Sequence, residues 1–270
     1  MKQTRFVNRR QPPIGRPRRI YGVHPVTAWL RSHPRRLEVV HYDGRFRSQL
    51  GAILDLAAAA GVPREPCAGD RLTSLAGTSR HQGIVATAGA FPYLDLEGVL
   101  DGPVTPRLLV VADHLQDPHN LGALLRTANA AGAGAVITPK DGAVGVTASV
   151  EAVAAGAAAL VPVCRVTNTV RALRALKARG YWCVGLMPRN GLNLYRFQAP
   201  QRVVVVVGGE TGMRPLLAKL CDVGVSIPMR GRVESLNASV AAAIVLYELI
   251  RQWQSGESGV DPIVSNSAAV

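Results

Sequence analysis

The sequence has few of the residues that build disulfide or metal frameworks. Its 270 residues include four cysteines, which stand far apart and form no C-x-x-C pair: Cys67, Cys164, Cys183 and Cys221. His114 and His119 flank one loop, but their spacing is a poor signature for metal ligands. We therefore expect no zinc site, no other bound metal, no disulfide scaffold, and a reducing, cytoplasmic location.

Long apolar runs are also missing. The longest candidate, residues 152–163, is interrupted by Gly156 and Pro162 and is shorter than the roughly 20 residues that span a bilayer. The basic start of the chain is not followed by the apolar stretch of a secretory signal. Mitochondrial transit peptides are also rich in arginine, but this start has few serines and the adjacent Pro12 and Pro13. We expect no membrane segment.

Acidic residues are scarce, because 18 Asp and Glu face 31 Lys and Arg, a formal net charge of +13. This balance favours a polyanionic partner, most simply nucleic acid, although a basic protein without such a role has the same composition. The first 19 residues hold no acid and these basic side chains: Lys2, Arg5, Arg9, Arg10, Arg16, Arg18 and Arg19. We predict that residues 1–17 form a disordered basic arm that lies on phosphates.

Hydrophobic periodicity divides the rest of the chain into two parts. Residues 18–90 have a compact α/β pattern, with a helix within 22–34, a strand at 36–43, a helix at 46–61 and a strand at 83–88. Residues 91–106 mix proline, glycine and acids and are predicted to be a linker.

From residue 107 to residue 254, apolar strands alternate with helices. Strands are predicted at 107–113, 135–138, 160–166, 181–187, 202–210 and 223–228, and helices at 120–132, 148–159, 168–180, 213–221 and near the C-terminus. Strands this apolar indicate a parallel sheet covered by helices on both faces. Residues 255–270 are predicted to be a polar tail.

The first stretch with chemical potential runs from Asp113 to Gly132 and begins where a predicted strand ends. Open α/β sheets place their ligands at this edge. Asn120 is positioned to cap the following helix, and Arg126 lies one to two turns further along. A helix cap and a solvated surface charge explain the two residues equally well, so spacing alone leaves their role open.

The second stretch, Val203 to Met213, is a glycine-rich turn after a strand of valines, with Glu210 as its only acid. Glycines let backbone amides approach a ligand closely. The spacing matches neither a dinucleotide fingerprint nor a phosphate-binding P-loop, so an ordinary strand-to-helix turn is the alternative.

The third stretch, Ser226 to Leu249, joins a short strand to an apolar helix through Ser235, Asn237 and Ser239. Ser235 or Asn237 is able to cap the helix, but one cap needs only one side chain. Surplus polar groups at the mouth of a buried helix favour a ligand site.

In this order, the three stretches resemble the motifs of the SpoU (TrmH-type) family of RNA ribose 2′-O-methyltransferases. Over residues 18–253 the chain resembles most closely those members that act on a guanosine ribose of 23S ribosomal RNA. The resemblance implies an α/β fold with a trefoil-knotted, parallel-sheet (SPOUT) catalytic domain at 107–254. It also implies a small N-terminal α/β/α RNA-binding domain at 18–90, similar to ribosomal proteins, S-adenosyl-L-methionine as cofactor, and a homodimer.

The resemblance also assigns roles to particular residues. The catalytic residues it implies are Asn120, Arg126, Glu210, Ser235 and Asn237. The cofactor-binding residues it implies, acting mostly through their backbone, are Gly208, Gly209, Gly212, Ile227, Met229 and Leu236.

The second motif departs from the family pattern, because Gly212 follows Glu210 by two positions where the family usually has three. Two alternatives to a ribosomal RNA enzyme remain. One is a transfer RNA ribose 2′-O-methyltransferase, and the other is an RNA-binding protein with impaired catalysis.

Overall fold

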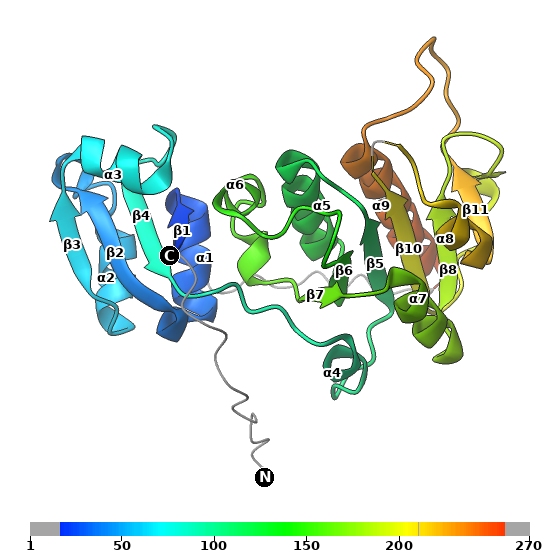
Figure 1. Ribbon diagram of the computed structural model, residues 1–270, viewed down its shortest axis with the longest axis horizontal. Helices are drawn as coiled ribbons and strands as arrows, with labels where there is room; N and C mark the ends of the chain where they lie inside the picture. Colours follow the sequence, from blue (N-terminus) through cyan, green and yellow to red (C-terminus); the bar gives the residue numbers. More distant parts are fainter. Residues whose placement is uncertain (1–16, 210, 257–270) are drawn as a thin grey trace. The chain divides into compact units, whose positions relative to one another are not determined.

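The computed structural model describes residues 17–209 and 211–256 of the chain (Figure 1). The chain divides into two compact units, which we describe separately. Unit 1 contains Met1–Pro92 and Val146–Leu160, and unit 2 contains Tyr93–Gly145 and Val161–Val270. Nearly all of the predicted basic arm and polar tail, and Glu210, lie outside the described residues.

Unit 1 is built on a four-stranded sheet with the order β1-β4-β2-β3. Its strands are β1 (Arg18–Tyr21), β2 (Leu37–Asp43), β3 (Arg64–Cys67) and β4 (Ile84–Ala88). β4 pairs antiparallel with β1 and β2, and β3 pairs parallel with β2. The two predicted strands are confirmed as β2 and β4, whereas β1 and β3 were not predicted.

Three helices of unit 1 cover this sheet: α1 (Val23–Ser32), α2 (Gly51–Ala59) and α3 (Gly69–Ala76). α1 and α2 share one apolar core with the strands, to which α1 contributes Val26 and Trp29. α3 contacts β1, β2 and β4 and buries Leu72, which lies outside that core. The helices predicted within 22–34 and 46–61 are therefore confirmed with shorter bounds.

Residues 146–160 also belong to unit 1, although the sequence pattern runs through them without a break. The single helix predicted at 148–159 is wrong, because the segment forms α6 (Ala148–Val153) and a short 3-10 turn (Ala157–Ala159). α6 ends at Val153, and Ala155 and Gly156 then have positive φ, +50° and +97°. A Cβ on Gly156 would lie 2.8 Å from Ala28 Cβ and 3.1 Å from the His24 carbonyl oxygen of α1. Glycine at this position therefore allows the turn after the helix to pack on α1.

A buried carboxylate connects α6 to the sheet and to α1. Glu151 pairs with Arg18 of β1, and Trp29 Nε1 donates a hydrogen bond of 2.8 Å to the same carboxylate oxygen. The Arg18 guanidinium carbon lies 4.3 Å from the centre of the Trp29 ring. Burial raises the pKa of Glu151 to about 7, although Arg18 and the Trp29 hydrogen bond act in the opposite direction.

Unit 2 is built on a seven-stranded sheet with the order β7-β6-β5-β10-β8-β11-β9. Its strands are β5 (Leu108–Asp113), β6 (Ala135–Pro139), β7 (Val163–Val166), β8 (Trp182–Leu186), β9 (Leu192–Asn193), β10 (Val203–Gly208) and β11 (Val223–Ser226). Every pair of neighbours is parallel, which confirms the predicted parallel sheet. β10 lies between β5 and β8, two strands that both precede it in sequence.

The helices of unit 2 are α4 (Leu96–Leu100), α5 (Pro118–Ala130), α7 (Thr169–Ala178), α8 (Pro215–Leu220) and α9 (Ala238–Gly256). α4, α7 and α8 share one apolar cluster with alternate residues of the strands, such as Val204 and Val206. α5 and α9 pack against each other outside that cluster, and α9 also contacts β10 (Figure 1). Cover on both faces explains why the five valines at 203–207 are all buried.

The segment predicted as a linker contains α4, whose Leu96 and Leu100 are buried in the cluster of unit 2. The sequence prediction missed this helix because it is one turn long and is surrounded by glycine, proline and acids. In the described part of the chain, no helix combines the length and the apolarity needed to cross a bilayer.

Candidate functional site

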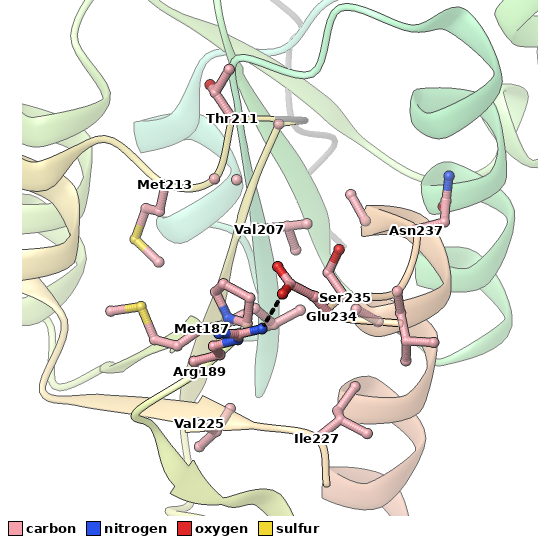
Figure 2. Close-up of a pocket in the computed structure, with 18 of the residues that line it drawn as sticks. Met187, Arg189, Val207, Thr211, Met213, Val225, Ile227, Glu234, Ser235 and Asn237 are labelled. Carbon is pink, nitrogen blue, oxygen red and sulfur yellow. Dashed lines mark ion pairs between the residues drawn. The ribbon is translucent and has the colours of Figure 1, made fainter. Parts of the chain in front are cut away.

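A cavity of about 890 Å³ opens at the carboxyl edge of the sheet of unit 2. Its walls come from the ends of β8, β10 and β11, from the start of α9 and from Asn120 of α5 (Figure 2). The predicted site residues that line it are Asn120, Gly208, Gly209, Gly212, Ile227, Met229, Ser235, Leu236 and Asn237. Three stretches that are distant in the sequence therefore meet at one cavity.

The order of the strands explains this position. β5 leads along the chain to β6 and β7 on one side of the sheet, and β8 and β11 lie on the other side of β10. In open parallel sheets a crevice forms at the carboxyl ends where the strand order reverses. The pairing of Gly208 with Asp113 aligns the ends of β10 and β5 beside this crevice.

The turn after β10 depends on its glycines. A Cβ on Gly208 would clash with the backbone of Gly212 and Met213, and a Cβ on Gly209 would lie 2.5 Å from the His114 carbonyl oxygen. Gly212 has φ +83°, and its N–H donates to the Gly209 carbonyl over 2.9 Å. The wall of the cavity at this turn is therefore backbone, which presents N–H and C=O groups to a ligand.

The polar residues at the mouth of α9 have different tasks. The Asn237 side-chain oxygen accepts hydrogen bonds from the Ser239 N–H at 2.9 Å and the Val240 N–H at 3.4 Å, so Asn237 caps the helix. The Ser239 hydroxyl donates to the same oxygen over 2.6 Å. Capping therefore uses only one of the three polar side chains, as predicted, and the Ser239 hydroxyl binds the capping oxygen. Ser235 remains on the cavity wall, exposed and outside the cap.

Asn120 does not cap α5, contrary to one reading of the sequence. α5 begins at Pro118, and the Asp117 carboxylate accepts from the His119 N–H over 2.9 Å. Proline is favoured at the first helical position and aspartate is favoured just before it, so these two residues fix the start of the helix. Asn120 thus lies within the first turn, where it is buried at the cavity.

A hydrogen bond between two amides joins the first and third stretches. Asn237 Nδ2 donates to Asn120 Oδ1 over 2.7 Å. The orientation of the Asn237 amide follows from its cap, because the oxygen that accepts the N–H groups of α9 leaves the nitrogen to donate. The start of α5 is therefore fixed relative to the start of α9, at one wall of the cavity.

The cavity does not account for two of the predicted catalytic residues. Arg126 is exposed on α5 and is not among the residues that line the walls. Glu210 lies outside the described residues. Their catalytic roles remain predictions.

Asp113 and Arg214 form an ion pair that sequence reasoning missed. The Asp113 carboxylate is fully buried at the end of β5, and Arg214 Nε and Nη2 bind its two oxygens at 2.6–3.1 Å. Arg214 Nη2 also donates to the Thr169 hydroxyl at the start of α7, and the Asp113 carbonyl accepts from Gly209 N–H over 3.0 Å. Both ends of the glycine turn are thereby held against β5. The position of Asp113 at the end of a buried strand was the available signal.

The loop after β8 forms the wall opposite α9 and was also missed. Arg189 pairs with Glu234 over 2.7 Å, drawn as a dashed line in Figure 2, and both side chains are mostly exposed. Met187, Met213 and Met229 line the cavity, which accounts for three of the four methionines in the chain. Thioether side chains are flexible and polarisable, and they adapt to an irregular ligand surface.

Comparison with known families matches both parts of the chain. The SpoU rRNA methylase family model matches residues 107–247. The model for the substrate-binding region of RNA 2′-O ribose methyltransferases matches residues 19–94.

Individual relatives agree with these matches. The 23S rRNA (guanosine-2′-O-)-methyltransferase RlmB of Ralstonia nicotianae is 47% identical over 236 residues, which cover 86% of this chain and 95% of the relative. RlmB of Bordetella pertussis is 44% identical over 236 residues, which cover 86% of this chain and 96% of the relative. Among solved structures, the SpoU methyltransferase AviRb from Streptomyces viridochromogenes, in complex with the cofactor AdoMet, has a TM-score of 0.74 and 27% identity, covering 88% of this chain and 91% of AviRb.

We predict that Asn237→Ala lowers the free energy of unfolding by about 0.5–2 kcal/mol, the usual range for loss of an N-cap. Ser235→Ala is the matched control, because this neighbour lines the same cavity but does not cap α9. It should change the stability by less than about 0.5 kcal/mol. Urea denaturation measures both, and equal losses in the two variants would disprove the assignment of the cap.

Proposed function

The chain belongs to the SpoU rRNA methylase family, and from this premise we propose that it methylates the ribose 2′-oxygen of a guanosine in 23S ribosomal RNA, with S-adenosylmethionine as donor. The observation that carries the proposal is the meeting of all three motif stretches at one cavity on the carboxyl edge of a parallel sheet. The relatives of known activity align over nearly their whole length, so no large part of their sequence lacks a counterpart.

The cavity fits the proposed cofactor in size and chemistry. Its volume lies within the range of sites for small organic ligands. The glycine turn offers backbone where a Cβ would clash, which suits the polar edges of a nucleoside. Val225, Ile227 and Leu236 offer apolar surface for a base. We assign the binding of S-adenosylmethionine to the backbone of Gly208, Gly209 and Gly212 and to residues 227, 229 and 236.

When bound, the cofactor supplies a methyl group on a positively charged sulfur, which is already a strong electrophile. The task of the protein is then to align a ribose hydroxyl with that methyl group and to help its proton leave. Ser235 and Asn120 both line the cavity, and their hydroxyl and amide groups are suited to hold a ribose. Asn237 acts on the site mainly by holding Asn120.

We assign Arg126 to the RNA rather than to the cofactor. Its exposure on α5 places the guanidinium where a phosphate or a developing oxyanion is able to reach it. An arginine is a poor general base because its guanidinium group stays protonated in proteins. Its contribution is therefore electrostatic, through stabilisation of negative charge in the transition state.

Unit 1 is proposed to select the RNA. Its sequence at 19–94 matches the substrate-binding model of RNA ribose methyltransferases, and this match favours ribosomal RNA over transfer RNA as substrate. The 2′-hydroxyl distinguishes RNA from DNA, and the net charge of +13 suits a polyanion. An enzyme of this kind works where ribosomal RNA is processed, which is consistent with a cytoplasmic location.

We further propose a homodimer and a trefoil knot. The dimer is supported by Val240 and Tyr247, which are 47% and 50% exposed and lie seven residues apart on α9, on one face of the helix. The knot is supported by the path of the chain, since β10 inserts between β5 and β8 and the segment after β11 returns to the same edge. Knots are rare in proteins, so the general rules of chain topology do not predict one here. The expectation of a knot comes from membership of this family.

The first experiment measures methyl transfer from tritiated S-adenosylmethionine to unmodified 23S ribosomal RNA and to transfer RNA, followed by mapping of the methylated nucleotide. We expect one 2′-O-methylguanosine in the 23S RNA and no incorporation into transfer RNA. Methylation of transfer RNA alone would support the other substrate class. RNA binding without methylation of either RNA would show that catalysis is lost.

Arg126→Ala should lower the rate of methylation by about 100-fold, the usual effect of removing one group that stabilises transition-state charge. The affinity for S-adenosylmethionine should stay within about twofold of the native value, because Arg126 does not line the cavity. Single-turnover kinetics and calorimetric titration measure the two quantities. Arg171→Ala, which removes another exposed arginine of unit 2, controls for the loss of general positive charge. A near-native rate in Arg126→Ala would overturn the assigned role.

A further inference from the structure

The ion pair between Glu151 and Arg18 has no part in the proposed reaction, yet it is among the most buried in the described chain. The exposed fractions of the two side chains are 1% and 9%. Trp29 donates to the same carboxylate oxygen, and the Arg18 guanidinium lies over its ring. A buried charge that loses its partner is strongly destabilising, so this cluster holds β1, α1 and α6 in one arrangement.

The cluster joins regions that the family models separate. Trp29 lies within the substrate-binding match at 19–94, which Arg18 directly precedes, whereas Glu151 lies within the methylase match at 107–247. The ion pair therefore bridges 133 positions of sequence. It connects the part of the chain that we assign to RNA with a segment of the catalytic region.

Apolar contacts reinforce the same attachment. Gly156 lies so close to Ala28 and to the backbone of α1 that no side chain fits there. Ala159, 4% exposed, is part of the apolar core of unit 1. Residues 146–160 are thus built into unit 1 by both charge pairing and packing.

The ends of this segment are continuous with unit 2. The chain leaves unit 2 after Gly145 and enters it again at Val161, directly before β7. Unit 1 is consequently joined to unit 2 by three covalent crossings of the chain, where a simple linker would give one. If 146–160 came loose from unit 1, the crossing between Pro92 and Tyr93 would be the one covalent link left between the rest of that unit and the catalytic region.

We propose that Glu151 is a positioning residue that fastens residues 146–160 into the RNA-binding unit and so couples RNA capture to methylation. The catalytic part of this inference, the coupling of RNA capture to methylation, rests on the proposed function. Its structural part, the fastening of 146–160, is independent of that function.

The test compares Glu151→Gln with the native protein in two measurements. Glutamine keeps the size of the side chain and its acceptor oxygen for Trp29 but removes the attraction to Arg18. We expect the KM for RNA to rise about fivefold or more, with kcat and the affinity for S-adenosylmethionine within about twofold of native. Hydrogen exchange of the amides of 148–160 should become about tenfold faster, while β10 stays unchanged.

Asp43→Asn is the matched control. It weakens another ion pair of unit 1 with a buried carboxylate, Asp43 with Arg45, but both partners lie within three positions of sequence. This variant should leave exchange of 148–160 and the KM for RNA near native. If the same rise in KM occurs in Asp43→Asn, or if KM is unchanged in Glu151→Gln, the coupling is refuted.

The two proposals fail in different ways. A native protein that methylates no RNA refutes the proposed function, whatever Glu151 does. Unchanged hydrogen exchange of 148–160 in Glu151→Gln refutes the present inference, even in a fully active enzyme. If Glu151→Gln folds poorly, Arg18→Lys, which keeps the charge but loses the planar group over Trp29, provides a milder second variant with the same two readouts.

Discussion

The architecture of unit 2 depends on the pairing of β10 with two strands that both precede it in sequence, β5 and β8. Five consecutive buried valines make β10 suitable only for the centre of a sheet that is covered on both faces. Once β10 is inserted there, Gly208 lies opposite Asp113, and the glycine turn must pass the end of β5. The contacts of Asp113 with Gly209 and Arg214 follow from this register. The cavity is therefore a consequence of strand order.

The wall of the cavity that α5 and α9 form depends on one side chain, Asn237, which has two roles. The Asn237 oxygen satisfies N–H groups at the start of α9, and its nitrogen binds Asn120. An amide can do this because it carries a donor and an acceptor on one rigid plane. An aspartate would cap the helix equally well but would offer no donor to Asn120. The requirement for an asparagine is thus set by hydrogen bonding in two directions.

The sequence was sufficient for features that depend on local pattern. The apolar strands of unit 2 and the glycine turn are confirmed because burial on both faces and close backbone contact each limit the residue types allowed. The cap at Asp117 and the end of α6 at Val153 were not predicted, since several neighbouring residues are compatible with each role and the folded chain decides which of them takes it. The position of Asp113 at a strand end marks it as a site candidate, but its pairing with Arg214 was not predictable, because it spans 101 positions and follows from tertiary structure.

The division of the chain into units has a consequence for the order of folding during synthesis. Unit 1 begins at the N-terminus but includes residues 146–160, which leave the ribosome only after β5, α5 and β6 of unit 2 have been made. Until then Trp29 and Arg18 lack the carboxylate of Glu151, and the surface of α1 beside Gly156 is uncovered. Unit 1 is still completed before unit 2, whose last helix ends at Gly256, but its completion has to wait for the synthesis of the first part of unit 2.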